Sequence, residues 1–370
     1  MLPELAITGA TVIWLAVLIL PWQPWRTREQ FTPEADRRRS LDTVTVVIPA
    51  RNEADVIAGT LAALKQQDPD LRIILVDDQS TDATADRARE HGTSRLQILS
   101  APPLPAGWSG KLWALEQGFR RVQTDYTLLL DADIELQAGV IAGLLDKLER
   151  ENLQMISLMA RLRMVSGWEK LLMPAFIYFF KLLYPFALAN HPDSRVAAAA
   201  GGCILIRTRA FAAVGGPAGL RTALIDDCAL ARRVKHNGGR IWLGLTHAAI
   251  SRRRYENLAT IWEMVTRTAY TQLHYSPWLL TACILLLLET YAVPVAGLFY
   301  PGSARWLAVL AVLGMCGSYL PTLRYYGLPG WRVLILPVAA MLFGLMTLDS
   351  ARRHLAGHGA RWKNRTYTGT

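Results

Sequence analysis

The sequence has few cysteines and no glycine-rich phosphate-binding loop, and each absence excludes a class of protein. None of the four cysteines, Cys203, Cys228, Cys283 and Cys316, is spaced as C-x-x-C, and two of them lie in apolar runs. They suggest neither a zinc site nor a disulfide framework. The first predicted strand, VTVVIP, is followed by PARNEAD, which contains no glycine. The fingerprint G-x-G-x-x-G of a dinucleotide dehydrogenase is therefore missing, as is a Walker loop.

The sequence also lacks a basic, aromatic-interleaved motif of the kind that binds nucleic acid. Lys and Arg number 40 against 30 for Asp and Glu, which gives a formal net charge of +10. Such an excess suits nucleic acid, an anionic bilayer or an anionic small substrate. Because the positive clusters flank apolar segments, we assign the excess mainly to the membrane surface and expect no nucleic-acid partner.

Long apolar runs are present, and the first covers residues 5–20. Glu4 precedes this run, whereas Arg26 and Arg28 follow it and further arginines stand at 37–39. A cleaved signal peptide would carry its positive charge before the apolar core. We therefore predict an uncleaved anchor over residues 1–25, with its N-terminus outside and the next domain in the cytoplasm. An interfacial helix is the alternative, because the run is slightly short.

Three further apolar runs, residues 278–299, 306–323 and 333–348, predict membrane helices within 276–350. A juxtamembrane segment, 256–275, precedes them and a basic tail, 351–370, follows. Three full spans would put this tail outside, but its arginines and lysine favour the cytoplasm. Either one run is re-entrant or interfacial, or the tail departs from the tendency. We favour a cytoplasmic tail on a multi-pass protein of the plasma membrane, with the soluble domain also cytoplasmic.

Strand and helix patterns alternate through the soluble domain, residues 43–255. Apolar runs that predict strands begin at Val44, Arg72, Leu96, Tyr126 and Met155, and helical patterns separate most of them. This alternation predicts an α/β fold with a mainly parallel sheet. Ligands of such sheets bind beyond the carboxyl ends of the strands.

The segment YTLLLDADIEL ends a buried strand with two aspartates, Asp131 and Asp133. Charge is costly beside a buried strand unless it has a partner. Mg²⁺ in proteins commonly uses one or two carboxylates together with substrate phosphates. The pair therefore predicts a cation site at the strand end, and a solvated turn that caps the next helix is the alternative.

Six segments, in order, resemble the family-2 glycosyltransferases, which have the GT-A fold: PARNE, LVDDQSTDAT, GWSGKLWAL, LLLDADIEL, GGCILIRTRAF…VGG and IDDCALARRVKHNGG. GWSGK and the terminal WKNRTY resemble more narrowly the membrane-anchored group associated with hopanoid biosynthesis and its carotenoid-glycosylating relatives. The resemblance implies a nucleotide-sugar-binding domain over 43–255.

The resemblance also implies roles for individual residues. Asp131 and Asp133 match the family's motif for Mg²⁺ or Mn²⁺, with Asp133 the direct ligand and Asp131 also near the donor. Asp227, in an Asp-Asp pair where the family has Glu-Asp, is the expected general base; a helix N-cap is the structural alternative. The remaining expected donor-binding residues are Pro49, Arg51, Glu53, Asp78 and Lys111. The alternative for Arg51 is a plain surface arginine, and the alternative for Lys111 is a lysine at the start of a helix.

The apolar, aromatic segment 168–190 contains Pro174, Lys181 and Pro185, which make it a poor membrane span. We expect it to lie in the membrane interface, with a buried core helix as the alternative, and from the interfacial position we expect a lipid acceptor.

The expected activity is metal-dependent, inverting transfer of one sugar from a nucleotide-diphosphate donor, such as a UDP-sugar, to a membrane lipid, with a hopanoid-related lipid as a candidate. The family's processive synthases carry Q/R-x-x-R-W before their membrane helices, and SRRRY and VTRTAY do not fit that motif. The missing motif argues against a processive polysaccharide synthase, which is kept as an alternative together with a nucleotidyltransferase and a catalytically inactive membrane scaffold that binds nucleotide-sugar.

Overall fold

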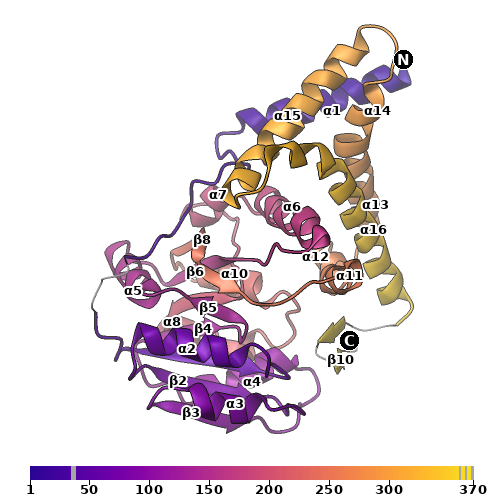
Figure 1. Cartoon of the computed structure of the whole chain (residues 1–370). Coiled ribbons are helices and arrows are strands. Elements are labelled where there is room, and N and C mark those ends of the chain that lie inside the picture. Colours follow the sequence, from indigo (N-terminus) through magenta and orange to yellow (C-terminus); the bar gives the residue numbers. More distant parts are fainter. Residues whose placement is uncertain (35–38, 358–359, 363–364, 368–370) are drawn as a thin grey trace.

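The computed structural model describes the chain except for residues 35–38, 358–359, 363–364 and 368–370 (Figure 1). Its centre is an eight-stranded mixed sheet in the order β3-β2-β1-β4-β7-β6-β8-β5. The pairs β3–β2, β2–β1, β1–β4 and β6–β8 are parallel, and β7 joins the two parallel groups by antiparallel pairing with β4 and β6. The strands are β1 (Val44–Ala50), β2 (Arg72–Asp77), β3 (Leu96–Ser100), β4 (Tyr126–Leu130), β5 (Ile134–Leu136), β6 (Met155–Arg161), β7 (Cys203–Arg207) and β8 (Ile241–Ser251). The α/β fold with a mostly parallel sheet is thus confirmed.

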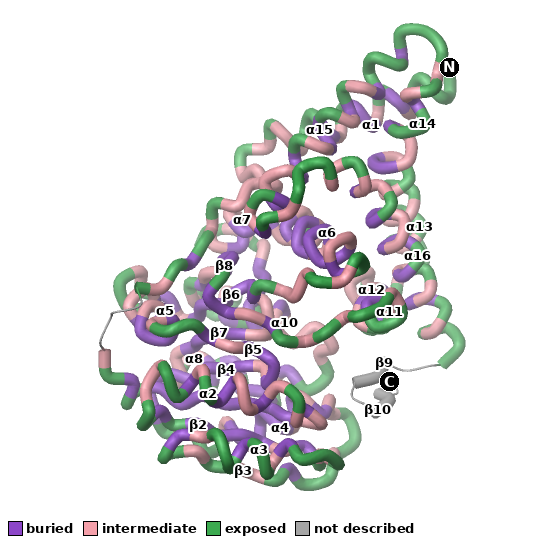
Figure 2. The backbone as a smooth tube through the Cα atoms, in the orientation of Figure 1, coloured by how far each residue is buried: buried purple, intermediate pink, exposed green. Residues whose placement is uncertain are grey.

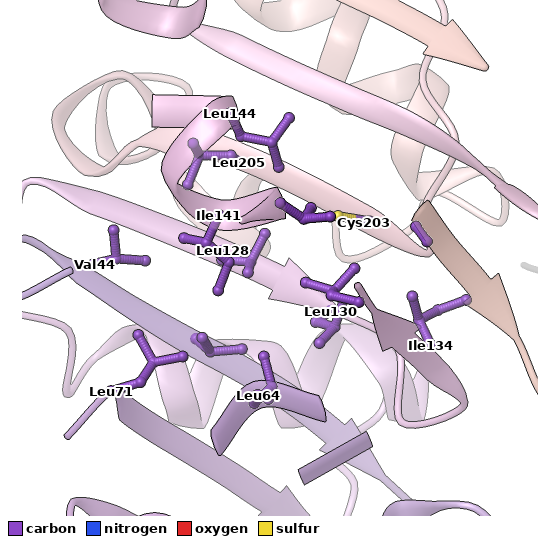
Figure 3. Packing of buried hydrophobic residues seen from close by; sticks show 14 of the residues in the cluster. Val44, Leu64, Leu71, Leu128, Leu130, Ile134, Ile141, Leu144, Cys203 and Leu205 are labelled. Carbon is purple, nitrogen blue, oxygen red and sulfur yellow. The ribbon is translucent and has the colours of Figure 1, made fainter. Parts of the chain in front are cut away.

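Helices cover both faces of this sheet. Every residue of β1 and β4 is buried, as expected of central strands that are covered on both sides. Figure 3 shows Val44, Leu128 and Leu205 from adjoining strands packing with Leu64 and Ile141 from helices. The covering helices are α2 (Ile57–Gln67), α3 (Thr84–His91), α4 (Gly110–Phe119), α5 (Val140–Arg150), α8 (Thr208–Ala213), α9 (Gly216–Gly219) and α10 (Asp226–His236). This packing fixes the strand ends that carry the acidic residues.

The chain between the N-terminal helix α1 (Leu2–Ile19) and the sheet is itself attached to β8. The Phe31 amide donates to Leu245 O and the Leu245 amide to Glu29 O, both at 2.8 Å. The Thr246 hydroxyl donates to Phe31 O at 2.8 Å. The buried ammonium of Lys181 also donates to the Arg26 carbonyl. The linker is therefore a hydrogen-bonded part of the domain.

Four helical stretches among the described residues are long and apolar enough to cross a membrane: Leu2–Ile19, Pro277–Gly297, Ala304–Tyr325 and Gly330–Leu355. The second consists of α13 (Pro277–Leu287), the π-helix η1 (Leu288–Ala292) and α14 (Val293–Gly297). The third is α15, and the fourth joins the 3₁₀ helix η2 (Gly330–Ile335) to α16 (Leu336–Leu355). Figure 2 shows much of their outward surface exposed, in contrast to the buried strands. Trp278 is 84% and Trp306 72% exposed, as suits side chains that meet lipid.

The path of α16 differs from that of α1, α13–α14 and α15. Near its start, η2 packs on α15. Near its end, Asp349 accepts a hydrogen bond from Trp262 of α11 (Leu258–Thr266) at 2.8 Å. Ser350 accepts from the Tyr270 amide of α12 (Ala269–Gln272) at 3.1 Å. In Figure 1, α16 passes over α6 (Gly167–Leu183), with both ends turned toward the sheet domain. Such a path is expected if one of the three C-terminal apolar runs, here residues 333–348, is re-entrant or interfacial and does not cross the membrane.

Helix α6 and the short α7 (Phe186–Asn190) form most of the segment expected in the membrane interface. Leu172, Met173 and Tyr178 are completely buried, and the Tyr178 hydroxyl is 2.7 Å from Ser318 Oγ of α15. Only the ends of α6, at Trp168 and Leu183, expose large apolar side chains. Most of α6 is therefore covered by protein, as the core-helix alternative requires.

The basic tail contains an antiparallel pair of strands, β9 (Ala360–Trp362) and β10 (Arg365–Tyr367). Part of the WKNRTY motif, Lys363 and Asn364, lies outside the described residues.

Candidate active site

The pair Asp131 and Asp133 stands directly after β4, as the sequence predicts. The Asp131 amide donates to Gly202 O at 3.0 Å, and the Ile134 amide donates back to Asp131 O at 3.1 Å. This turn leads at once into β5, whose residue Ile134 pairs with Ser251 at the end of β8. The two aspartates are thus held between the ends of β4, β7 and β8.

Asp133 is only 5% exposed and both of its carboxylate oxygens have partners. Ser251 Oγ donates to Oδ2 at 2.6 Å, and Arg253 Nη2 donates to Oδ1 at 3.2 Å. Arg253 Nη2 also lies 3.1 Å from Glu53 Oε1. Burial by itself raises the pKa of Asp133, but Arg253 and Ser251 outweigh it and hold this pKa below its usual value.

Lys111 neutralises the other aspartate from the first turn of α4, which Ser109 caps by accepting from the Leu112 amide. Its Nζ lies 2.8 Å from Asp131 Oδ1 and 4.0 Å from Asp226 Oδ2. Although burial lowers the pKa of Lys111, the surrounding carboxylates raise it overall, so the ammonium stays charged. The pKa of Asp131 is nevertheless raised, because burial outweighs the effect of Lys111.

Asp227 lies beside this group, in the first turn of α10, where it also accepts the Cys228 amide at 2.7 Å. Burial and the neighbouring Asp226 raise the pKa of Asp227 to about 6, against the opposing effect of Lys111. A Cβ at Gly201 would lie 3.1 Å from Asp227 Oδ2 and 3.5 Å from Lys111 Nζ. Glycine at 201 therefore lets the backbone approach both groups closely.

One cavity of about 1300 Å³ contains these side chains and continues to the membrane helices. Its polar end is lined by Pro49, Glu53, Lys111, Asp131, Asp133, Asp226, Asp227, Arg253 and Tyr255. Its apolar wall includes Trp14 of α1, Phe179 of α6, Cys283 of α13, Tyr291 of η1 and Phe343 of α16. Charged groups from the sheet and apolar groups from the membrane helices thus share one chamber.

Two of the predicted donor-binding residues, Arg51 and Asp78, are not among the residues that line this cavity. Arg51 Nη1 donates to the carbonyls of Asp78, at 2.5 Å, and Gln79, at 3.1 Å. Asp78 is completely buried, and its amide donates to Ala50 O at 2.8 Å. Arg51 stands two residues after Pro49 and Asp78 directly follows β2, the strand beside β1, and the contact of both residues with a nucleotide stays a prediction.

The side chains of Asp131 and Asp133 have the chemistry that the predicted metal ion requires. They do not by themselves complete the coordination of an ion. Carboxylate oxygens are ligands that Mg²⁺ and Mn²⁺ prefer. Among the described residues, no group of three or more His, Cys, Asp or Glu is placed to hold an ion. An ion here would need oxygens from a substrate, which is the usual manner of Mg²⁺ binding at phosphates.

Sequence reasoning missed Arg253 and Ser251, which contact Asp133. The comparison of the segment SRRRY with Q/R-x-x-R-W gave neither Ser251 nor Arg253 a role at the site. The available signal was structural: Ser251 pairs with Ile134, one residue after Asp133, only because β5 adds to β8 in antiparallel register.

Comparisons with known proteins support the family resemblance. Residues 45–215 match the family described as Glycosyl transferase family 2. A 4,4'-diaponeurosporenoate glycosyltransferase from Staphylococcus haemolyticus is 35% identical over 104 residues, 27% of this chain and 28% of that protein. The protein of the same name from Staphylococcus aureus is 34% identical over 92 residues, 25% of this chain and 24% of its own length. The chain thus matches about a quarter of the length of these curated relatives.

A solved structure extends the similarity beyond the family segment. A mannosyltransferase from Pyrobaculum calidifontis, in complex with GDP-Man and Mn²⁺, superposes with a TM-score of 0.54 at 18% identity. The superposition covers 98% of this chain and 100% of the other. At this identity the likeness establishes the fold. Residues 45–215 are a family 2 glycosyltransferase domain with the GT-A fold.

Proposed function

We propose that this protein transfers a single sugar, with inversion, from a nucleotide-diphosphate sugar to a membrane lipid. The observation that carries the proposal is the cavity that joins the carboxylates after β4 and in the first turn of α10 to the membrane helices. A soluble acceptor would have no use for the apolar half of this chamber. The names of the relatives and the GDP-Man of the structural neighbour support sugar transfer from a nucleotide donor.

The donor's diphosphate would lie beside Asp131, Asp133, Lys111 and Arg253. Asp131 and Asp133 would hold Mg²⁺ or Mn²⁺, which supplies Lewis-acid stabilisation of the leaving phosphate. The Mn²⁺ named with the structural neighbour supports this assignment. Lys111 contributes a fixed positive charge at the same place, and Arg253 provides the planar, bidentate donor geometry that suits phosphate.

Asp227 would act as the general base that removes the proton from the attacking acceptor oxygen. A base works best when its pKa lies near the operating pH. With a pKa of about 6, Asp227 is ionised at neutral pH and remains a stronger base than an ordinary aspartate. Because inversion requires attack opposite the leaving group, the acceptor oxygen would lie on the Asp227 side and the diphosphate on the Asp133 side.

The acceptor's apolar part would lie against an aromatic cluster formed by Trp14, Phe176, Phe179, Tyr291 and Phe343. Ring centroids are 5.4 Å apart for Trp14–Tyr291, 5.7 Å for Phe179–Tyr291 and 5.4 Å for Phe179–Phe343. All five rings line the cavity. They come from α1, α6, η1 and α16, so the membrane helices themselves build this wall. A hopanoid-related lipid is one acceptor that fits this class.

The proposal is tested with purified protein in lipid nanodiscs, UDP- or GDP-sugars, a membrane-lipid extract and Mg²⁺ or Mn²⁺. We expect sugar transfer by the wild type, and loss of about 100-fold or more in Asp227→Asn. Asp226→Asn, which removes the adjacent carboxylate, is the matched control and keeps most of the activity. Full activity of Asp227→Asn would remove the base assignment, and full activity in a chelator would remove the metal.

The same assay separates the alternatives. An inactive scaffold would bind nucleotide without turnover on any lipid, and a processive synthase would yield a polymer rather than a singly glycosylated lipid. Mass spectrometry of membrane lipids with and without the gene identifies the acceptor through the lipid that loses its sugar.

A further inference from the structure

We infer that Lys111 and Arg253 are internal counter-ions that occupy the metal-binding carboxylates until the donor arrives, so that the divalent ion and the nucleotide diphosphate bind as a pair. This inference rests on the proposed function, because it assigns Asp131 and Asp133 to the metal. It concerns how the ion and the nucleotide bind together and does not depend on the acceptor.

The contacts assign one cation to each aspartate. Lys111 Nζ is 2.8 Å from Asp131, and Arg253 Nη2 is 3.2 Å from Asp133. The second oxygen of Asp133 accepts from Ser251 at 2.6 Å. Each oxygen of Asp133 therefore already has a hydrogen-bond donor, and an ion that binds this carboxylate has to compete with Arg253 and Ser251.

Arg253 has a second acidic partner, which makes it suited to exchange. Its Nη2 lies 3.1 Å from Glu53 Oε1, so it bridges a carboxylate from the β1–α2 loop and one from the β4–β5 turn. The side chain of Arg253 is 37% exposed, whereas those of Glu53 and Asp133 are 10% and 7% exposed. The two carboxylates are fixed in the wall, and the guanidinium is the partner that reaches into the cavity.

Charge balance then decides what enters. A divalent ion alone would compete with Lys111 and Arg253 for the same oxygens and would leave these cations unpaired, which is costly in a buried site. A diphosphate alone would meet Glu53, Asp131 and Asp133 at short range. When both arrive together, phosphate oxygens accept Lys111 and Arg253, and the released carboxylates bind the ion. The added charges nearly cancel, so the pair enters without a net electrostatic penalty.

The test measures metal binding without acceptor or turnover. Mn²⁺ is titrated into the purified full chain, with binding followed by electron paramagnetic resonance, alone and with saturating UDP or GDP. We expect the wild type to bind Mn²⁺ at least about 5-fold more tightly with the nucleotide, and by linkage the nucleotide to gain the same factor from Mn²⁺. We call the factor by which the nucleotide tightens Mn²⁺ binding the synergy. In Arg253→Gln, we expect Mn²⁺ alone to bind more tightly by a similar factor, and we expect the synergy to fall.

Arg252→Gln is the matched control, because it removes the same charge one residue away. Arg252 pairs with Glu135, outside the metal-binding pair, and its side chain is 52% exposed. We expect its Mn²⁺ affinity to equal that of the wild type, and we expect Arg253→Lys to retain part of the synergy. Thermal unfolding of each variant tests whether it is folded.

Three outcomes would overturn the inference: equal effects of the two glutamine substitutions, wild-type binding of Mn²⁺ alone as tight as with nucleotide, or unchanged synergy in Arg253→Gln. In the last two cases Mn²⁺ still binds and the proposed function stands. Absence of Mn²⁺ binding under every condition would remove the metal from the proposed function as well.

Discussion

At the scale of single residues, the pKa of Asp227 sets the expected pH dependence. The pKa is raised to about 6, so the base is protonated below this pH and the rate should fall there. Because this pKa belongs to the enzyme without substrates, we expect kcat/KM to be level above pH 7 and about 10-fold lower at pH 5. Measurement of kcat/KM from pH 5 to 8 tests this, and a flat profile would contradict it. In Asp226→Asn the loss of activity on the acid side should begin at a lower pH, because the charge of Asp226 helps to raise the pKa of Asp227.

A second residue prediction concerns Glu169, whose side chain is completely buried at the start of α6. Its carboxylate accepts from the amides of Val165, Ser166 and Tyr255, at 2.8–2.9 Å, and from Arg163 Nη1 at 2.9 Å. Glu169→Ala leaves these donors without their acceptor and should destabilise the protein by about 3–5 kcal/mol. Chemical unfolding in detergent measures the change.

The control for Glu169 is Glu256→Ala, since the side chain of Glu256 is 68% exposed and lies 3.9 Å from Arg254. Its effect should stay within about 0.5 kcal/mol. Equal effects of the two substitutions would show that the carboxylate network around Glu169 does not stabilise the fold.

The strand end locates Asp131 and Asp133 in the sequence, whereas Lys111 and Asp227 follow from the family resemblance, and the structure places all four side chains on one cavity. The same reasoning could not find Arg253, since its partners Glu53 and Asp133 are 200 and 120 residues away in the chain. A long-range ion pair leaves no local pattern, whereas a buried run that ends in Asp-x-Asp does.

At the scale of elements, the π-helix η1 shapes the apolar wall of the cavity. A π-helical turn disturbs the regular backbone hydrogen bonds, and such turns often lie at functional sites. Here the indole of Trp14 donates to the Thr290 carbonyl at 2.7 Å and so joins α1 to η1. This bond fixes Tyr291 against Trp14 and Phe179 in the aromatic cluster.

Cysteines already present in the chain test whether a lipid occupies this wall. Cys283 of α13 lines the cavity, whereas Cys316 of α15 does not. With acceptor lipid at ten times its Kd, a membrane-permeant maleimide should label Cys283 about 10-fold more slowly. Mass spectrometry of the labelled peptides measures the rates. Labelling of Cys316 is the internal control, and equal slowing at both positions would contradict the assignment.

Element prediction from the sequence succeeded where the pattern was local. The predicted starts at Val44, Arg72, Leu96, Tyr126 and Met155 are the first residues of β1, β2, β3, β4 and β6. In contrast, β5 and β8 were not predicted. Strand β5 has only three residues, and β8 alternates poorly because Gly244 and Thr246 interrupt its apolar run. Both strands are stabilised by pairing with each other, which tertiary structure alone provides.

At the scale of the whole molecule, the path of α16 predicts the side of the C-terminal tail. If α1, α13–α14 and α15 cross the bilayer and α16 lies along it, the tail returns to the side of the sheet domain. We therefore expect a green fluorescent protein fused after Thr370 to fluoresce, and alkaline phosphatase fused there to be inactive. Phosphatase fused before Met1, behind an added signal sequence, should be active. Active phosphatase at the C-terminus would show that α16 is a fourth span.

The sequence left this topology open because hydropathy measures length and composition but not direction. The basic residues of the tail already favoured the cytoplasm. What the sequence could not supply was the contact of Asp349 and Ser350 with α11 and α12, which turns the end of α16 back toward the sheet.

The pairing of the N-terminal linker with β8 has a geometric consequence. Leu245, the residue to which the linker is bonded, stands six residues before Ser251 in β8, and β8 shifts its register against β6 between Leu245 and Ile250. The same strand therefore connects the linker that follows α1 to Ser251, the partner of Asp133. Under the proposed function, this connection would hold Asp133 at a set height above the lipid, so an acceptor would have to offer its reactive oxygen at that depth. Lipids that carry this oxygen higher or lower in the headgroup layer would then be rejected by position alone, before any side chain distinguishes their chemistry.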